Sequence, residues 1–315
     1  MTVEYRTARR DDEIALSALW ATAFAGAPVE DLWAAAPERH RHTLVAVDDG
    51  HVVSALHHQP RPLRSATGAV ERVGCVGSVA TLSRARGRGH VRALLAAAVR
   101  AMTADGCAWS LLFTDTPGVY EGEGWRTFSR PTWHGPPAGE TSAPRPGHEA
   151  RVRTALAADR TALAALHDAY DAHRPLTTVR TADDWAHRVP TWYAPATTDT
   201  LLAEDAAGRP VGYVVLRRHR DGTTDVDEIA LGAAAPAEPL ARALFAAAAE
   251  RAGPGTVRVH LPADGAVLAA LPVLLAEAWV TDDRTGMARP LHATAAAVRA
   301  TVTAPGAAHW YGDSF

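Results

Sequence analysis

The feature that most limits how this chain can fold is an internal repeat. The stretch RTARRDDEIALSAL from Arg6 and the stretch RTALAADRTALAAL from Arg153 share Arg-Thr-Ala, one aspartate and two leucines at a constant offset. A strand, turn and strand pattern follows in both halves, in LVAVDDGHVVSAL from Leu44 and in LLAEDAAGRPVGYVVL from Leu201. This correspondence indicates that one folding unit has been duplicated.

Each copy predicts an α/β unit with a mixed sheet, so the fold class is two tandem domains of the same plan. The length of 315 residues and an apolar fraction of 47% can supply two hydrophobic cores. We expect a first domain at 1–135 and a degenerate second domain at 150–291. A polar linker rich in proline and glycine would join them at 136–149, and a tail would cover 292–315.

The first copy contains a turn rich in arginine and glycine, RARGRGH at 84–90, that leads into an apolar helical pattern. Backbone N–H groups at the start of a helix favour an anion such as a phosphate. Gly87 and Gly89 let the backbone approach a ligand, and the arginines can add charge-assisted hydrogen bonds. The second copy has GAAAPAE at 232–238, with Pro236 and no arginine. The pattern predicts a phosphate site in the first copy only, although a solvated basic turn would look the same.

Several classes of function are disfavoured. The turn is neither a P-loop nor a Gly-x-Gly-x-x-Gly turn, which argues against ATP and NAD. A net charge of −3 gives no reason to expect nucleic acid. No apolar run reaches the roughly 18 residues that cross a membrane, and the start of the chain does not resemble a signal peptide. Cys75 and Cys107 lack the spacing of a metal or redox motif. We expect a cytoplasmic protein without a metal site.

The combination of VGSVATL-SRARGRGHVRALL and SLLFTDTPGVYEGEGW resembles the GNAT superfamily of acyl-CoA-dependent N-acyltransferases. Its signature Arg/Gln-x-x-Gly-x-Gly/Ala matches Arg84, Gly87 and Gly89, and the loop, helix, strand and Tyr-x-x-x-Gly-aromatic element follow in the family's order. The second half resembles the family only in its framework. The arrangement is similar to Eis-type acetyltransferases, in which the first copy acetylates amines that include aminoglycoside antibiotics, so antibiotic resistance is one implied role.

The resemblance implies acetyl-CoA as the cofactor. The strand at 79–81 would pair with the pantetheine arm, the turn and helix start would hold the pyrophosphate, and the end of the next strand would lie beside the thioester. The residues implied to bind the cofactor are Val79, Ala80, Thr81, Arg84, Arg86, Gly87, Arg88, Gly89, His90, Val91, Arg92, Asp115 and Thr116.

The resemblance also implies a catalytic acid at Tyr120, whose hydroxyl would protonate the leaving thiolate of coenzyme A. The second copy has Leu274 at this position, which favours a role for the tyrosine over simple packing against Trp125. A backbone N–H of Val79 or Ala80 would polarise the thioester carbonyl.

Several groups are candidates for the base that accepts the amine proton. Glu71 opens the strand that leads to the turn, and His57 and His58 lie on the strand before it. In Eis enzymes the carboxyl terminus faces the active site, and this chain ends in HWYGDSF, so Phe315 is a further candidate. The alternative is a tail that packs on the surface.

Carboxylates and indoles in the early helices and in the tail would suit a cationic amine. A solvated face and a core tryptophan are the alternative interpretations. The candidates for acceptor binding are Glu30, Asp31, Trp33, His58 and Asp313, with Trp133 as a further one.

We therefore expect an acetyl-CoA-dependent N-acetyltransferase that acts on a primary amine of a small molecule, such as an antibiotic or another natural product. One alternative keeps the chemistry and changes the acceptor to a protein lysine or N-terminus. Another is a non-catalytic module that senses acyl-CoA. We expect a small-molecule partner, no nucleic acid and no membrane, and a homo-oligomer is possible.

Overall fold

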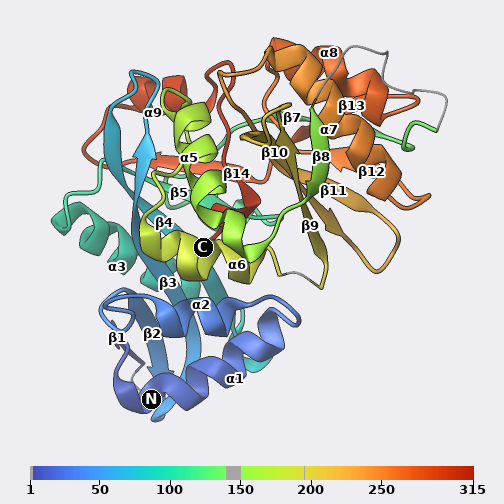
Figure 1. The fold of residues 1–315 in the computed structure, drawn as a ribbon. Coiled ribbons are helices and arrows are strands. Elements are labelled where there is room, and N and C mark those ends of the chain that lie inside the picture. The colour runs from blue at the N-terminus through green and yellow to red at the C-terminus, as the bar shows by residue number, and fades with distance from the viewer. Residues whose placement is uncertain (1–2, 140–149, 195) are drawn as a thin grey trace.

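The structure is a computed structural model that describes residues 3–139, 150–194 and 196–315. It contains two seven-stranded mixed sheets (Figure 1). Residues 140–149 of the predicted linker lie outside the described residues. The predicted fold class, mixed α/β with two tandem units, is confirmed.

The first sheet carries the N-terminal unit. Its strands, in spatial order, are β1 (Glu4–Thr7), β2 (Thr43–Asp48), β3 (His51–Arg64), β4 (Val70–Thr81), β5 (Trp109–Phe113), β14 (Gly286–Pro290) and β6 (Arg126–Thr127). The helices of this unit are α1 (Glu13–Ala23), α2 (Val29–Ala35), α3 (His90–Ala104) and the short α4 (Gly118–Glu121). Only β4 and β5 are parallel neighbours, because α3 crosses between them.

The second sheet repeats this order. Its strands are β13 (Trp279–Asp283), β7 (Arg130–Gly135), β12 (Val257–Val259), β11 (Thr224–Leu231), β10 (Pro210–Arg218), β9 (Thr198–Glu204) and β8 (Arg151–Thr154). The helices are α5 (Arg160–Asp171), α6 (Val189–Trp192), α7 (Ala237–Arg251) and α8 (Gly265–Leu274), and α9 (Ala295–Val302) follows the last strand. Here β11 and β12 form the parallel pair that α7 connects.

The two copies begin with the same ion pair. Arg6 donates to both carboxylate oxygens of Asp12 at 2.6 and 3.0 Å, and Arg153 donates to both oxygens of Asp159 at 2.7 and 2.9 Å. Each aspartate also accepts a backbone N–H three residues before it. The residues that revealed the repeat therefore fix the first helix of each unit to its first strand.

The sheets exchange their last strands. Strand β7 lies within 1–135 and pairs with β12 and β13 of the second sheet. Strand β14 lies within 150–291 and pairs with β5 and β6 of the first sheet. Backbone ladders therefore tie the two units together, and the sheets cross the predicted domain boundaries at this point.

The chain's last residues lie in the middle of the molecule. Figure 1 shows the C-terminus close to α6, between the lower lobe with α1 and α2 and the second sheet. The long strands β3 and β4 run upward from that lobe, and Ala66 at their turn donates to the hydroxyl of Thr301 in α9 at 3.0 Å. The hairpin and the C-terminal segment thus bring residues of both units to the centre.

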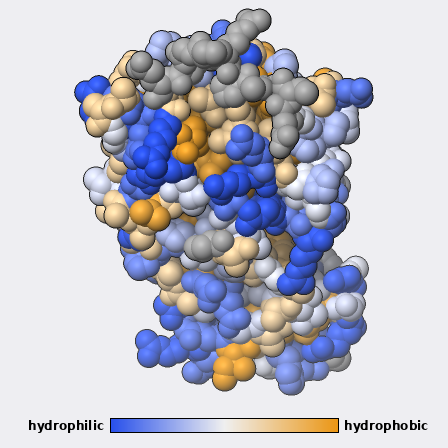
Figure 2. All heavy atoms as spheres, turned by 45° about the vertical axis from the view of Figure 1, so that its right-hand side comes forward, coloured by the Kyte–Doolittle hydropathy of each residue, from blue (hydrophilic) through white to orange (hydrophobic). Residues whose placement is uncertain are grey.

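Hydrophilic residues dominate the face shown in Figure 2, where hydrophobic residues form only small separate groups. None of the described helices combines the length and the apolar character that crossing a bilayer requires.

Candidate active site

The parallel strands β4 and β5 separate before either one ends. They pair only from Val73–Cys75 to Trp109–Leu111. Beyond Cys75, the edge of β4 that faces β5 has no strand partner among the described residues. Its backbone groups are open to an extended ligand, which could add to the sheet as a strand does.

A bulge lies in β4 just beyond this separation. His57 of β3 is paired with Gly77, but Ala55 is paired with Ala80, so that two residues of β4 stand opposite one of β3. Ser78 has a positive φ of 54°, and its carbonyl accepts the indole N–H of Trp20 at 2.9 Å. The bulge reorients the strand at the segment that the sequence predicts to carry an oxyanion donor.

The arginine and glycine turn leads directly into α3. Gly87 and Gly89 have φ values of 75° and 81°, which L side chains rarely adopt, and Gly89 caps the helix. The side chain of His90 is buried, with Nδ1 3.0 Å from the Tyr5 hydroxyl, so only its main chain is available at the turn. Arg84, Arg86, Arg88 and Arg92 are all exposed around it. The turn therefore has the glycine conformations and the surrounding charge of a phosphate site.

A cavity of about 510 Å³ opens where the strands part. It is lined by Val79 from the bulged strand, by the exposed Asp115 and Thr116 after β5, and by Tyr120 from α4. Phe315 lines the same cavity. The structure thus brings the predicted acid, the predicted thioester neighbours and the last residue together at one place.

Tyr120 is buried, with 8% of its surface exposed. Its ring packs edge-on against Trp125, with the ring centroids 6.4 Å apart. Burial raises the pKa of its hydroxyl, and the side chain of Thr114 partly offsets this effect. The tyrosine thus makes the packing contact and also keeps a protonated hydroxyl at the cavity.

The C-terminal segment reaches the cavity from the opposite side. The carbonyl of Ser314 accepts hydrogen bonds from Nη1 of Arg188 and Nε1 of Trp192, both at 2.8 Å. The carboxyl end of Phe315 lies against the backbone of Gly77, where a Cβ atom would overlap it. The glycine on β4 is therefore necessary for the close approach of Phe315.

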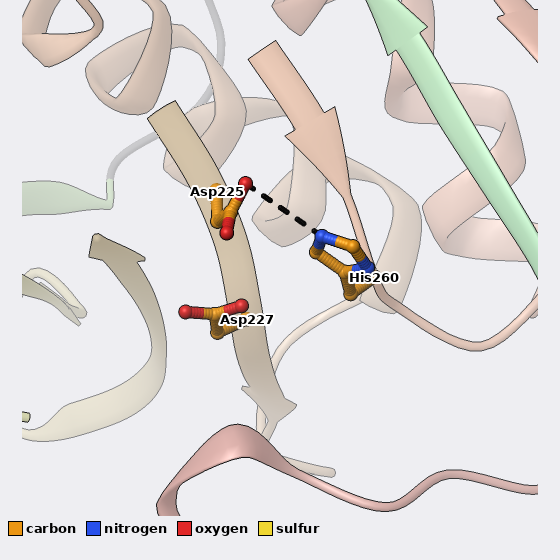
Figure 3. Close-up of side chains that lie close together, drawn as sticks. All are labelled: Asp225, Asp227 and His260. Carbon is orange, nitrogen blue, oxygen red and sulfur yellow. Dashed lines mark ion pairs between the residues drawn. The ribbon is translucent and has the colours of Figure 1, made fainter. Parts of the chain in front are cut away.

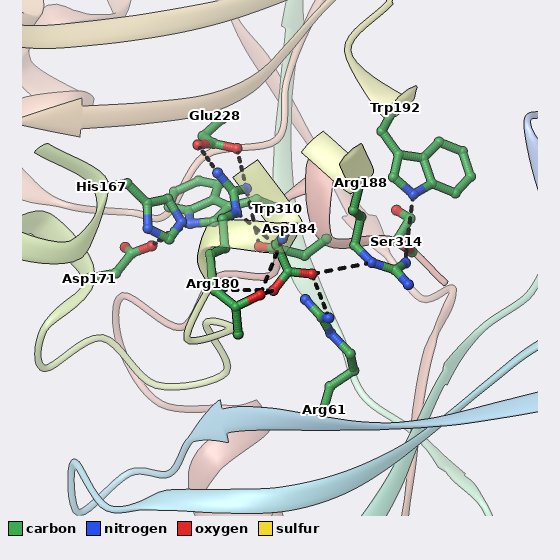
Figure 4. A network of polar contacts seen from close by, with 12 residues as sticks. Arg61, His167, Asp171, Arg180, Asp184, Arg188, Trp192, Glu228, Trp310 and Ser314 are labelled. Atoms are coloured by element: carbon green, nitrogen blue, oxygen red, sulfur yellow. Dashed lines mark hydrogen bonds and ion pairs between the residues drawn. The ribbon is translucent and has the colours of Figure 1, made fainter. Parts of the chain in front are cut away.

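A buried ion network holds this segment in place (Figure 4). Arg180 donates to both oxygens of Glu228, at 2.9 and 2.7 Å, and to both oxygens of Asp313, at 2.8 and 3.2 Å. Tyr193 and Tyr213 donate to Glu228 as well. Burial by itself would raise the pKa of Asp313 and Glu228, but the charge and hydrogen bonds of Arg180 lower both.

The structure places Asp313 in a different role from the one expected. Its carboxylate is fully buried and bound by Arg180, so it anchors the tail and cannot meet an acceptor amine directly. Glu30 and Asp31 are exposed on α2 and do not line the cavity, whereas Trp33 does. His58 packs against the ring of His42 away from the cavity, and Trp133 is part of the second sheet.

The two other base candidates differ in position. Glu71 lies near the start of β4, accepts the indole N–H of Trp109 at 2.7 Å and is not in the cavity. His57 lines the cavity, and its Nδ1 lies 3.0 Å from the hydroxyl of Thr43. Burial, together with the charge of the neighbouring His58, lowers the pKa of His57 to about 3. Its imidazole is therefore neutral at pH 7 and a weak proton acceptor.

Sequence reasoning missed Arg188 and Trp192, which line the cavity from α6 and the turn of helix before it. It also missed Gly77 as the contact of Phe315. Arg188 and Trp192 belong to the second copy, and a motif search within the first copy cannot reveal residues that the other copy supplies.

A second group of titratable residues lies on the second sheet. Ligand atoms of Asp225, Asp227 and His260 lie within 4.8 Å of one another (Figure 3). Asp225 accepts from Arg258 and from Arg217 at 2.8 Å, and Arg217 also donates to Asp227 at 2.7 Å. Two guanidinium groups thus already neutralise the two carboxylates, and we describe the group as an ion-pair network.

Residues 4–128 match the family model described as an acetyltransferase (GNAT) domain. This part of the chain is a GNAT acetyltransferase domain. The protein is accordingly an acyltransferase of the GNAT type. The match covers the parted strands, the turn and Tyr120, and it ends before β7, where the chain enters the second sheet.

Solved structures resemble nearly the whole chain. A probable N-acyltransferase from Enterococcus faecalis V583 has a TM-score of 0.72 at 16% identity, over 93% of this chain and 73% of that one. A GCN5-related N-acetyltransferase from Kribbella flavida has a TM-score of 0.70 at 23% identity, over 92% and 71%. Eis1 from Mycobacterium abscessus has a TM-score of 0.65 at 16% identity, over 92% and 74%. At these identities the likeness shows the shared fold. No curated protein sequence is significantly similar to this chain.

Proposed function

We propose that this GNAT protein transfers the acetyl group of acetyl-CoA to a primary amine of a small molecule. The observation that carries the proposal is the cavity between the parted ends of β4 and β5, which holds Tyr120, the bulged strand and Phe315 together. An acyl transfer to nitrogen needs an acid, an oxyanion donor and a proton acceptor around one carbonyl carbon.

In this proposal the cofactor lies along the open edge of β4. The backbone of Val79, Ala80 and Thr81 would pair with the pantetheine arm, and the turn with Gly87 and Gly89 would hold the pyrophosphate. The open strand edge and the left-handed glycines support this path. Bound acetyl-CoA would supply the thioester at the cavity, beside Asp115 and Thr116.

The residues of the cavity can then balance the protons of the reaction. The amine nitrogen attacks the thioester carbon, a C–N bond forms, and the carbonyl oxygen gains charge beside a backbone N–H of Val79 or Ala80. The C–S bond breaks as the intermediate collapses, and Tyr120 donates its proton to the thiolate sulfur. Its raised pKa keeps the hydroxyl protonated at neutral pH. The products are an N-acetyl amide and coenzyme A.

We assign the proton acceptor to the carboxyl group of Phe315. It lies against Gly77, next to the bulge, and no ion pair to it is found among the described residues. A carboxylate without a fixed cationic partner can attract an ammonium group and accept its proton. His57 is the less suitable base because burial lowers its pKa to about 3, and Glu71 lies outside the cavity.

The shape of the site favours a small acceptor over a protein lysine. Arg188, Trp192 and Ser314 close the cavity on the side opposite α4. A peptide needs an open groove, whereas a site that a second unit covers suits a small molecule. We keep the cytoplasm as the expected location, since Cys75 and Cys107 are buried free thiols.

The experiment is a thiol-release assay with acetyl-CoA and a panel of primary amines, run beside a titration of coenzyme A. Acetylation of an amine, with mass spectrometry of the product, supports the proposal. Binding of coenzyme A without turnover of any amine or lysine peptide would instead favour an acyl-CoA sensor. Turnover of lysine peptides alone would favour a protein acetyltransferase.

A further inference from the structure

The acceptor side of the cavity is formed mainly by apolar and aromatic side chains. On the side away from the turn and α4, its wall is made of residues that carry no charge: Phe24, Ala27, Val29, Leu32, Trp33 and Trp192. Helix α2 presents Val29, Leu32 and Trp33 to the cavity at helical spacing. Such a wall gains by burying an apolar body of the ligand, at about fourfold in affinity for each methylene group.

The acidic residues near this wall do not face it. Glu30 and Asp31 occupy the exposed face of α2, and Asp313 is bound by Arg180. The negative groups that remain at the cavity are Asp115, which is exposed after β5, and the carboxyl group of Phe315. One of them lies at the predicted thioester end, so the acceptor side has one anionic group to receive one ammonium group.

A positive charge also faces the acceptor side. Arg188 lines the cavity, and its Nη2 binds the side-chain oxygen of Gln59. Its Nε lies 3.5 Å from Asp184, but that carboxylate also accepts from Arg61 at 2.6 Å (Figure 4). Two guanidinium groups therefore share one carboxylate. A second ammonium group on the acceptor would meet this excess positive charge without a carboxylate to pair with it.

We propose that the acceptor is a monoamine with an apolar or aromatic body, and that polycationic amines are disfavoured at this site. This inference rests on the proposed function and names its substrate class. The single amine would lie at the carboxyl group of Phe315, beside the thioester, and the body of the molecule would pack against Leu32, Trp33 and Trp192.

The test compares two amines that differ by one charge, n-hexylamine and 1,6-diaminohexane, with 2-phenylethylamine and an aminoglycoside at the two extremes. We expect kcat/KM for n-hexylamine to exceed that of the diamine by about tenfold or more, a fold-change that one uncompensated charge at a partly buried site readily produces. 2-Phenylethylamine should be at least as good as n-hexylamine. A diamine or aminoglycoside that is equal or better would overturn the inference.

Direct binding separates this inference from the proposed function. Calorimetry of the full chain saturated with coenzyme A should show tighter binding of n-hexylamine than of 1,6-diaminohexane, whether or not turnover occurs. If no amine is acetylated, the proposed function is wrong, and the same titration still decides the charge preference. Equal or tighter binding of the diamine contradicts the inference.

A charge introduced into the wall provides a second test. Leu32→Asp places a carboxylate on the cavity face of α2, and it should raise kcat/KM for the diamine relative to n-hexylamine by about tenfold. Ala35→Asp adds the same charge to the exposed face of the same helix, outside the cavity. It should leave the preference as in the wild type. A preference that both variants change alike, or neither changes, would speak against the assigned wall.

Discussion

The ends of β4 and β5 and the ends of β11 and β12 have the same plan but different contents. In each unit a parallel pair covers three residues, Val73–Cys75 in the first and Thr224–Val226 in the second. Beyond the first pair lies the cavity with Tyr120. Beyond the second pair, Ala308 and Trp310 of the C-terminal segment pack into the core of that unit. The chain thus fills one cleft with its own residues and leaves the other open.

The start of the central helix differs in the same sense. Helix α3 begins after Gly89, which has a positive φ, whereas α7 begins after Pro236, which has no N–H to offer an anion. At the position that corresponds to Tyr120, the second unit has Leu274, which is fully buried in the core. The framework therefore needs only the buried apolar positions and the Arg–Asp pair, and the chemistry needs the turn and the tyrosine in addition.

The largest effect on turnover should come from Tyr120→Phe. Removal of the proposed acid should lower kcat by about 10²- to 10⁴-fold, while the affinity for coenzyme A stays the same. Tyr170→Phe is the control in the second unit, where that hydroxyl donates to Asp264 at 2.7 Å. Steady-state kinetics and calorimetry measure both. An unchanged kcat in Tyr120→Phe would remove the functional contrast between the units.

The buried network should dominate stability. Arg180→Gln leaves Glu228 and Asp313 without their counter-charge, and the free energy of unfolding should fall by about 3–5 kcal/mol. Arg153→Gln removes a partly exposed pair and should cost about 1 kcal/mol or less. Denaturant titration at pH 7 measures both. A similar, small loss in the two variants would show that the network does not anchor the tail.

The same network gives stability a definite dependence on pH. Arg180 lowers the pKa of Asp313 and Glu228 below the unfolded values of about 4. Their stabilisation is therefore complete above that range and is lost as the pH falls through the lower folded values. Arg180→Gln should lose less stability than the wild type between pH 5 and about 3. Parallel pH profiles for the two proteins would contradict this assignment.

A smaller effect is expected from Gly77→Ala. The new Cβ overlaps the carboxyl end of Phe315 and should displace it, so kcat/KM should fall by about tenfold with unchanged affinity for coenzyme A. Gly74→Ala, on the same strand, meets the flexible side chain of Met102 in the core. It should lower stability but preserve kcat/KM. Equal kinetics for the two variants would argue against Phe315 as the base.

The smallest effect is an absence of change at alkaline pH. Because burial raises the pKa of Tyr120 above its ordinary value of about 10, the hydroxyl should stay protonated. The profile of kcat against pH should therefore show no descending limb between pH 7 and about 9.5. A fall in kcat within this range, with the protein still folded, would show that the acid is a different group.

Local sequence patterns predicted the parts of the fold that depend on local chemistry. The Arg6–Asp12 and Arg153–Asp159 pairs, the turn at 84–90 and the two sheets follow from spacing and residue type. The strand exchange did not, because β7 and β14 have the same apolar pattern in either sheet and only tertiary packing selects between them. Periodicity also does not reveal which partner a strand will take.

The candidate site divides along the same line. Tyr120, Asp115 and Thr116 were predicted because they lie within the first copy, in a continuous pattern. Asp313 was given the wrong role because its partner Arg180 is 133 positions away in the sequence. Arg188 was missed because it binds a backbone carbonyl near the end of the chain, and such a contact leaves no motif.

The most direct measurement of the central claim is a calorimetric titration of coenzyme A into the full chain and two glycine variants. Gly87 and Gly208 both have a φ of 75° and open space around them, but only Gly87 lies at the predicted phosphate site. The account predicts one equivalent bound by the wild type and by Gly208→Val, and no binding by a folded Gly87→Val. Two equivalents in the wild type, or full affinity in Gly87→Val, would contradict it.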